Sequence, residues 1–179
     1  VAAVQYEPQL LNVAHNVQVA KQLAFEAAVK GARIIVLPEL SMSGFVLNSV
    51  REAADVSQQV DGYQTQSLQE IAKKFNCHIV FGYVELSEGS LYNSAVIVGP
   101  SCVEGNVRKH NLHGSDHLWA KPSDDPFPVI VTPVGRLGAL ICKDVTNNFR
   151  ESYRFHKPEH RFYRRGDVDV IALATNWGS

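Results

Sequence analysis

Apolar and polar residues follow two different spacings along this chain, and together these spacings predict an alternation of helices and strands. Apolar residues recur at helical intervals after a potential N-cap at Asn12 and again after the Asp61-Gly62 turn. Short apolar runs without that spacing instead predict strands. These runs are Val1–Gln5, Ala32–Leu37, His78–Leu86, Tyr92–Val98, Cys102–Lys109, Val129–Thr132, Leu137–Cys142 and Val168–Ala174.

The order of these elements predicts how the strands pair. A strand, a helix ending near Gly31 and the continuous apolar run Ala32–Leu37 form a β–α–β start, which favours a parallel pair covered on both faces. The next three runs are separated only by turn residues and indicate an antiparallel meander. Residues 111–128 are polar and Pro-rich and indicate a loop, and Pro158 should break any helix in the polar stretch that follows Cys142. The sequence therefore predicts an α/β fold with mixed sheets.

Composition limits the classes of protein to which the chain can belong. It has 179 residues, of which 45% are hydrophobic and 20% charged, so we expect one globular domain over residues 1–179. A net charge of −1 argues against binding to nucleic acid or to an anionic membrane. No apolar run approaches the length of a membrane span, and no signal-peptide layout is visible at the N-terminus. Three cysteines cannot all pair within the chain, which favours a reducing, cytoplasmic setting.

Three reactive side chains lie at the ends of apolar runs. Glu39 follows one run directly after Pro38, Lys109 closes another, and Cys142 closes a third. The ends of strands are where α/β proteins place functional groups, because the sheet fixes the backbone while the side chains still reach a crevice. Taken one at a time, such residues are more often solvated charges or buried packing cysteines. Spacing alone does not connect the three.

The local sequences do connect them. The segments RIIVLPEL, LYNSAVIV, VRKHNL and GRLGALICKD resemble, in order, motifs of the nitrilase (carbon–nitrogen hydrolase) superfamily. The resemblance implies a nitrilase-like four-layer α-β-β-α sandwich with Glu39 as general base and acid, Lys109 as oxyanion stabiliser and Cys142 as nucleophile. The segment Gly166–Trp177 also looks like a family position, which makes Asn176 and Trp177 candidate supporting residues.

The chain departs from the family pattern in several places. Family members continue beyond the region of Trp177, so we expect the domain to be incomplete at its C-terminus. The family often has a second glutamate in the loop after the lysine, whereas this loop contains none, and Asp116 is the candidate substitute despite its shorter reach. Lys143 stands where an aromatic residue is common. His113 is a candidate for the mouth of the pocket.

The implied chemistry needs no cofactor. Lys109 is expected to favour the Cys142 thiolate, and Glu39 to accept the thiol proton. The thiolate would attack an amide carbon, with the oxyanion held between the Lys109 ammonium and the backbone N–H of Lys143. Release of ammonia or an amine would leave a thioester on Cys142, which water activated by Glu39 then hydrolyses. The resemblance thus predicts an amidase-like hydrolase acting on a small non-peptide C–N bond.

Other interpretations remain open from the sequence. A true nitrilase, or a non-catalytic binding or regulatory module of the same fold, would carry the same motifs. The spacing of His110, His113 and His117 is that of metal ligands on a helix, but their surroundings indicate a loop, so we expect no metal. The basic and aromatic residues between Arg150 and Arg165 fit a solvated flank or a subunit contact better than nucleic-acid binding. The family often pairs its subunits, so a homodimer or higher homo-oligomer is expected.

Overall fold

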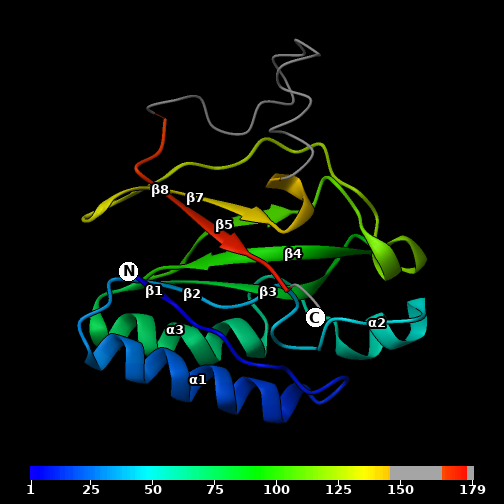
Figure 1. Cartoon of the computed structure of the whole chain (residues 1–179), viewed down its shortest axis with the longest axis horizontal. Coiled ribbons are helices and arrows are strands. Elements are labelled where there is room, and N and C mark those ends of the chain that lie inside the picture. Colours follow the sequence, from blue (N-terminus) through cyan, green and yellow to red (C-terminus); the bar gives the residue numbers. More distant parts are fainter. Residues whose placement is uncertain (146–166, 177–179) are drawn as a thin grey trace.

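The computed structural model describes residues 1–145 and 167–176, and Figure 1 shows the arrangement of their helices and strands. The helices are α1 (Val13–Val29), α2 (Val50–Val56) and α3 (Tyr63–Phe75), with a 3-10 turn, η1, at Gly114–Leu118. The strands are β1 (Ala2–Ala3), β2 (Ile34–Val36), β3 (His78–Ser87), β4 (Ser90–Val98), β5 (Val103–Arg108), β6 (Ile130–Thr132), β7 (Gly135–Ile141) and β8 (Val170–Ala174). Within these residues, no helix is both long enough and apolar enough to cross a membrane.

Two mixed sheets form the centre of the molecule. The larger sheet has the strand order β1-β2-β3-β4-β5, with parallel pairing from β1 to β3 and antiparallel pairing from β3 to β5. The smaller sheet has the order β6-β7-β8, in which β6 and β7 form a hairpin and β8 runs parallel to β7. The predicted parallel start, meander and hairpin are therefore confirmed.

The alternation of side chains along β3 explains why the layers stack. Ile79, Phe81 and Tyr83 point into a core shared with α1 and α3, whereas Val80 points into a second core shared with the smaller sheet. Helices α1 and α3 accordingly cover one face of the larger sheet, and strands β7 and β8 lie across the other (Figure 1). These elements supply a helical layer and both sheets of the predicted α-β-β-α sandwich.

Helix boundaries follow local chemistry. The Asn12 side chain accepts the backbone N–H of His15 at 3.3 Å, which caps α1 as predicted. Helix α3 begins after Gly62, also as predicted. Helix α2 was not expected from the sequence. It is only seven residues long and buries two of them, Ala53 and Val56, so it leaves almost no periodic signal.

Candidate active site

Glu39 is placed by a tight turn at the end of β2. The next residue, Leu40, has φ of 48°, and the turn lies directly against β3. A Cβ atom at Gly82 of β3 would come within 2.4 Å of the Leu40 nitrogen and 2.7 Å of the Glu39 Cα. Only glycine permits this approach. The packing leaves the Glu39 side chain completely buried, with no exposed surface.

Lys109 meets Glu39 from the neighbouring end of β5. Its backbone N–H donates to the Asn93 carbonyl at 2.8 Å, which continues the pairing of β5 with β4 by one residue. Its Nζ lies 2.7 Å from Glu39 Oε1 and 2.6 Å from Asp116 Oδ2, and the residue is only 1% exposed. A buried ammonium is tolerated only when it is paired and hydrogen-bonded, and two carboxylates meet that requirement here.

Asp116 lies in the site because it belongs to the 3-10 turn η1. The backbone N–H of His113 donates to Asp116 Oδ2 at 3.0 Å, which fixes the carboxylate at the start of the 3-10 turn. Asn93 then joins the two acids, since its Nδ2 donates to Glu39 Oε1 at 2.9 Å and to Asp116 Oδ1 at 3.1 Å. The aspartate side chain is shorter than that of the glutamate common in the family. The backbone of the loop brings Asp116 close enough for its carboxylate to reach Lys109.

Cys142 comes from the other sheet. It follows β7 with a φ of 41°, and a helical turn begins at the next residue, Lys143. Its backbone N–H donates to the Ala174 carbonyl at 2.9 Å, so the end of β8 holds the turn in place. A left-handed conformation at a non-glycine residue costs about 1–2 kcal/mol. A strand, a strained turn and a helix in this order form an elbow that presents the side chain between them.

The charges of the candidate site act on one another. Burial raises the pKa of the Cys142 thiol, as does the Glu39 carboxylate, while the Thr175 hydroxyl and Lys109 lower it. Burial also raises the pKa of Glu39, against the opposing effects of Lys109 and Asn93. For Lys109, burial lowers the pKa but Glu39 and Asp116 outweigh it, so the net pKa is raised.

These shifts bear on the expected thiolate. Lys109 lowers the pKa of the Cys142 thiol, whereas burial and the Glu39 carboxylate raise it, and the net pKa is raised. The expectation that Lys109 favours the Cys142 thiolate stays a prediction. Glu39 Oε1 accepts both nitrogen donors, whereas its Oε2 has no hydrogen-bond partner among the described residues. One carboxylate oxygen is therefore available to receive a proton.

Comparison with known proteins identifies the relationship. A family profile described as Carbon-nitrogen hydrolase matches residues 1–160. The chain belongs to the carbon–nitrogen hydrolase family. A nitrilase of Pyrococcus abyssi is 35% identical over 145 residues, which cover 80% of this chain and 55% of that protein. An (R)-stereoselective amidase of a Pseudomonas species is 31% identical over 63% of this chain and 40% of its own length.

Solved structures agree on the fold. The structure of this carbon–nitrogen hydrolase is similar to that of an amidase from Nesterenkonia sp., with a TM-score of 0.70 and 25% identity over 80% of this chain and 55% of that chain. It is also similar to an N-terminal amidase in complex with an Asn-Glu-Ala peptide, with a TM-score of 0.69 and 21% identity over 80% of this chain and 39% of that chain. The predicted nitrilase-like fold class is confirmed. The chain spans about half the length of the curated relatives it matches.

The remaining candidate residues lie at varied distances from the centre of the site. The His113 side chain is exposed, and its backbone N–H supports Asp116. The His110 ring shares a hydrogen bond of 2.9 Å with the Asp125 carbonyl and packs on Phe127. Asn176 is half-buried just after β8.

Some of the expectations lie outside the described residues. They concern Trp177, Pro158 and the basic segment between Arg150 and Arg165. Residues 1–145 and 167–176 contain no group of three or more His, Cys, Asp or Glu side chains that could hold a metal ion.

Three residues near the centre of the site were given no role in the sequence analysis. They are Asn93 and Asp144, which lie in the motif segments LYNSAVIV and GRLGALICKD, and Thr175. Asn93 is a fully buried polar residue within an otherwise apolar strand, and that contrast was the available signal. Thr175 directly follows the apolar run of β8, where strand ends place functional side chains.

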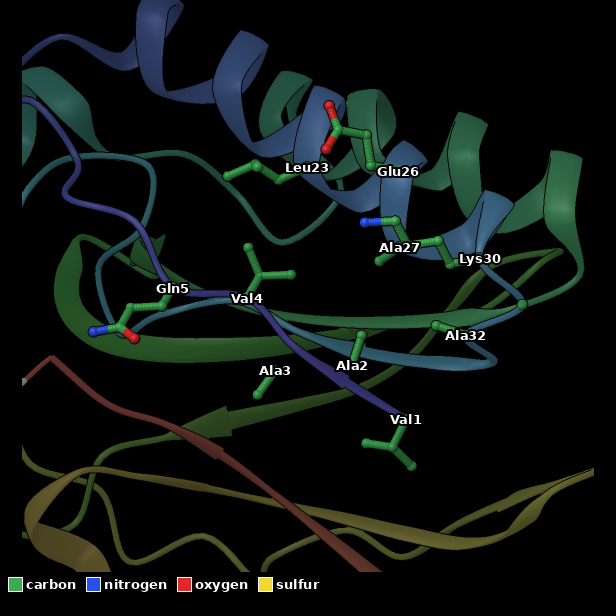
Figure 2. A pocket seen from close by; sticks show the side chains of 11 residues that line it. Val1, Ala2, Ala3, Val4, Gln5, Leu23, Glu26, Ala27, Lys30 and Ala32 are labelled. Atoms are coloured by element: carbon green, nitrogen blue, oxygen red, sulfur yellow. The ribbon is translucent and has the colours of Figure 1, made fainter.

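A surface cavity of about 450 Å³ lies away from this site, between β1 and the C-terminal half of α1. Figure 2 shows that the side chains around it are mainly aliphatic, among them Val4 and Leu23, with Glu26 and Lys30 at its border. It includes none of the candidate site residues.

Proposed function

We propose that this carbon–nitrogen hydrolase cleaves a small non-peptide amide through a thioester on Cys142. What supports the proposal is the buried ion pair of Lys109 and Glu39, whose Oε2 has no hydrogen-bond partner among the described residues, together with the effect of both charges on the pKa of the Cys142 thiol. A nucleophile, a base within reach of it and a cation for the developing oxyanion are the parts that acyl transfer requires.

The first half of the reaction forms the thioester. The Cys142 thiol gives its proton to Glu39 as the sulfur bonds to the amide carbon. The carbonyl electrons move onto oxygen, which is stabilised by the Lys109 ammonium and by the backbone N–H of Lys143 at the start of its helical turn. When the C–N bond breaks, Glu39 returns the proton to the departing ammonia or amine.

The second half releases the acid. Glu39 accepts a proton from water, whose oxygen attacks the thioester carbon and forms a second tetrahedral intermediate at the same oxyanion site. Collapse expels the Cys142 sulfur, which recovers its proton from Glu39. Asp116 and Asn93 take no proton in this sequence. They hold Lys109 and Glu39 in place through the bonds described above, and Asp116 thus fills the position of the family's loop glutamate.

A true nitrilase is the second candidate, and the 35% identity to the Pyrococcus abyssi nitrilase favours it. A nitrile would be attacked by the same sulfur, with the nitrile nitrogen taking the protons. We favour the amide because the (R)-stereoselective amidase is similar in sequence to this chain, and the amidase from Nesterenkonia sp. is similar to it in fold. A homodimer or higher homo-oligomer is proposed on the family resemblance alone, and a cytoplasmic setting on the three cysteines, which cannot all pair within the chain.

Acid-quenched mass spectrometry tests the proposal. The protein is incubated with a panel of small primary amides and with the matching nitriles, and the mass of the peptide containing Cys142 is measured. An acyl adduct formed from amides is expected, with Cys142→Ala as the blank and Cys77 and Cys102 as internal controls. Adducts formed only from nitriles would favour the nitrilase. Absence of any adduct and of any turnover would contradict catalysis and favour a non-catalytic module.

A further inference from the structure

Asp144 is a buried carboxylate two residues beyond the nucleophile. It has no exposed surface, and its Oδ1 accepts the backbone N–H groups of His110 and Asn111 at 3.2 Å and 2.8 Å. The Asn111 side-chain amide adds a third contact at 3.3 Å. The residue therefore joins the elbow that carries Cys142 to the two residues that directly follow Lys109.

This link crosses between the two sheets. The backbone bond of Lys109 goes to Asn93 within the larger sheet, and that of Cys142 goes to Ala174 within the smaller one. Between the sheets lies an apolar core, in which contacts are non-directional and fix relative position only loosely. Hydrogen bonds have preferred lengths and angles, so the Asp144 contacts can set the position of the larger sheet relative to the smaller one.

We propose that Asp144 is a positioning residue that fixes the Lys109 ammonium relative to the Cys142 sulfur. This inference rests on the proposed function, in which both groups must address the same carbonyl. Displacement of a catalytic group by about 1 Å can cost about 100-fold in rate. Without Asp144, Lys109 keeps both of its carboxylate partners, so the charge cluster should remain while its distance from the sulfur varies.

The surroundings of Asp144 agree with such a role. Burial raises its pKa to about 6, against the lowering effects of the Asn111 N–H and Lys109. The carboxylate accepts backbone N–H groups through Oδ1, and charge-assisted bonds of this kind are about twice as strong as neutral ones.

The experiment compares Asp144→Ala with Asp144→Asn in the full chain. Both variants remove the charge, but only asparagine keeps an acceptor oxygen for the His110 and Asn111 amides. We expect kcat of the alanine variant to fall by about 100-fold with little change in KM, and the asparagine variant to restore most of it. Asn111→Ala is the matched control, since it deletes the longest of the three contacts, keeps both backbone N–H donors and should have a small effect. Asp144→Ser, whose side chain is shorter, replaces the alanine variant if that variant does not fold.

Two readouts do not depend on turnover. Hydrogen exchange at the His110 and Asn111 amides should accelerate in the alanine variant and not in the asparagine variant. Alkylation of Cys142 by iodoacetamide at neutral pH should be slower in the alanine variant than in the asparagine variant, because a displaced Lys109 no longer lowers the thiol pKa. Equal alkylation rates and equal kcat in the two folded variants would overturn the role of Asp144. A wild-type protein that turns over no amide, but shows these differences, would overturn only the proposed function.

Discussion

Two adjacent residues of this chain, Arg108 and Lys109, each form an ion pair with a buried glutamate. The two pairs differ in whether both oxygens of the glutamate accept hydrogen bonds. Glu85 accepts Arg108 Nη2 on one oxygen at 2.7 Å, and Arg108 Nε, Ser94 and Asn106 on the other. Glu39 uses one oxygen for Lys109 and Asn93 and leaves the second without a partner among the described residues.

The pKa shifts of the two acids follow this difference. Burial raises the pKa of Glu85, but the hydrogen bonds from Arg108, Ser94 and Asn106 outweigh burial and the net pKa is lowered. At Glu39 the effect of burial on the pKa is larger than the lowering effects of Lys109 and Asn93, so the net pKa is raised. A fully hydrogen-bonded carboxylate is a poor proton acceptor and serves the structure, whereas a partly bonded one with a raised pKa accepts a proton more readily. The comparison distinguishes a structural ion pair from a candidate catalytic one on the same strand end.

Removal of Lys109 should cause the largest loss of stability and of turnover. Lys109→Met leaves Glu39 and Asp116 buried without their cation, and breaking a buried ion pair in this way costs about 3–5 kcal/mol. Urea unfolding should show that loss, and turnover should disappear with the oxyanion donor. Combining Lys109→Met with Asp116→Asn should recover part of the stability but none of the activity. Recovery of activity would contradict the role given to the ammonium.

Replacing each glutamate by glutamine tests the comparison directly. Glu39→Gln removes the proton acceptor and should lower kcat by about 100- to 10,000-fold, the usual contribution of general acid–base catalysis. Glu85→Gln should leave kcat nearly unchanged and lower the free energy of unfolding by about 1–3 kcal/mol, because buried donors lose a charged acceptor. Paired kinetics and urea unfolding measure both quantities. Similar effects of the two changes on kcat would contradict the distinction.

The same two acids should respond to pH in opposite directions. Glu39 has a raised pKa in the folded state, so its contribution to stability is present below the unfolded pKa and is lost as pH rises through the folded pKa. Glu85 has a lowered pKa, so its contribution is present above the unfolded pKa and is lost as pH falls through the folded pKa. Melting temperatures of the two glutamine variants, subtracted from wild type across pH 3–8, should slope in opposite senses.

Catalysis should follow the Glu39 titration as well. The acidic limb of kcat/KM is expected above the ordinary glutamate pKa of 4.5, since the base must first lose its proton. A limb at or below that value would show that another group acts as base.

The parallel start, the meander and the β6–β7 hairpin could be predicted from the sequence because each depends on local patterns. Alternation along β3 assigns Phe81 and Val80 to opposite cores, and capping at Asn12 marks the start of α1. The expectation that Glu39, Lys109 and Cys142 belong to one site followed only from family resemblance, because their separation in sequence says nothing about distance.

Other features of the site depended on tertiary structure and escaped prediction. Asp116 reaches Lys109 because η1 positions its backbone, a geometry that the composition of a polar loop does not reveal. The net rise in the pKa of the Cys142 thiol depends on its burial and on the nearby Glu39 carboxylate. The role assigned to Asp144 depends on two sheets meeting, and no pattern along a single element carries that information.

The left-handed backbone of Cys142 affects the choice of an inactive form for capturing substrates. Alanine at this position keeps the Cβ atom that opposes a φ of 41°, whereas glycine accepts it freely. Cys142→Gly should therefore melt at a higher temperature than Cys142→Ala, with a gain on the order of 1 kcal/mol, and differential scanning calorimetry can rank the two. The proposed nucleophile thus occupies a position whose backbone would be more relaxed without any side chain. A glycine-substituted protein would be the more robust scaffold for crystallography with the amides proposed as substrates.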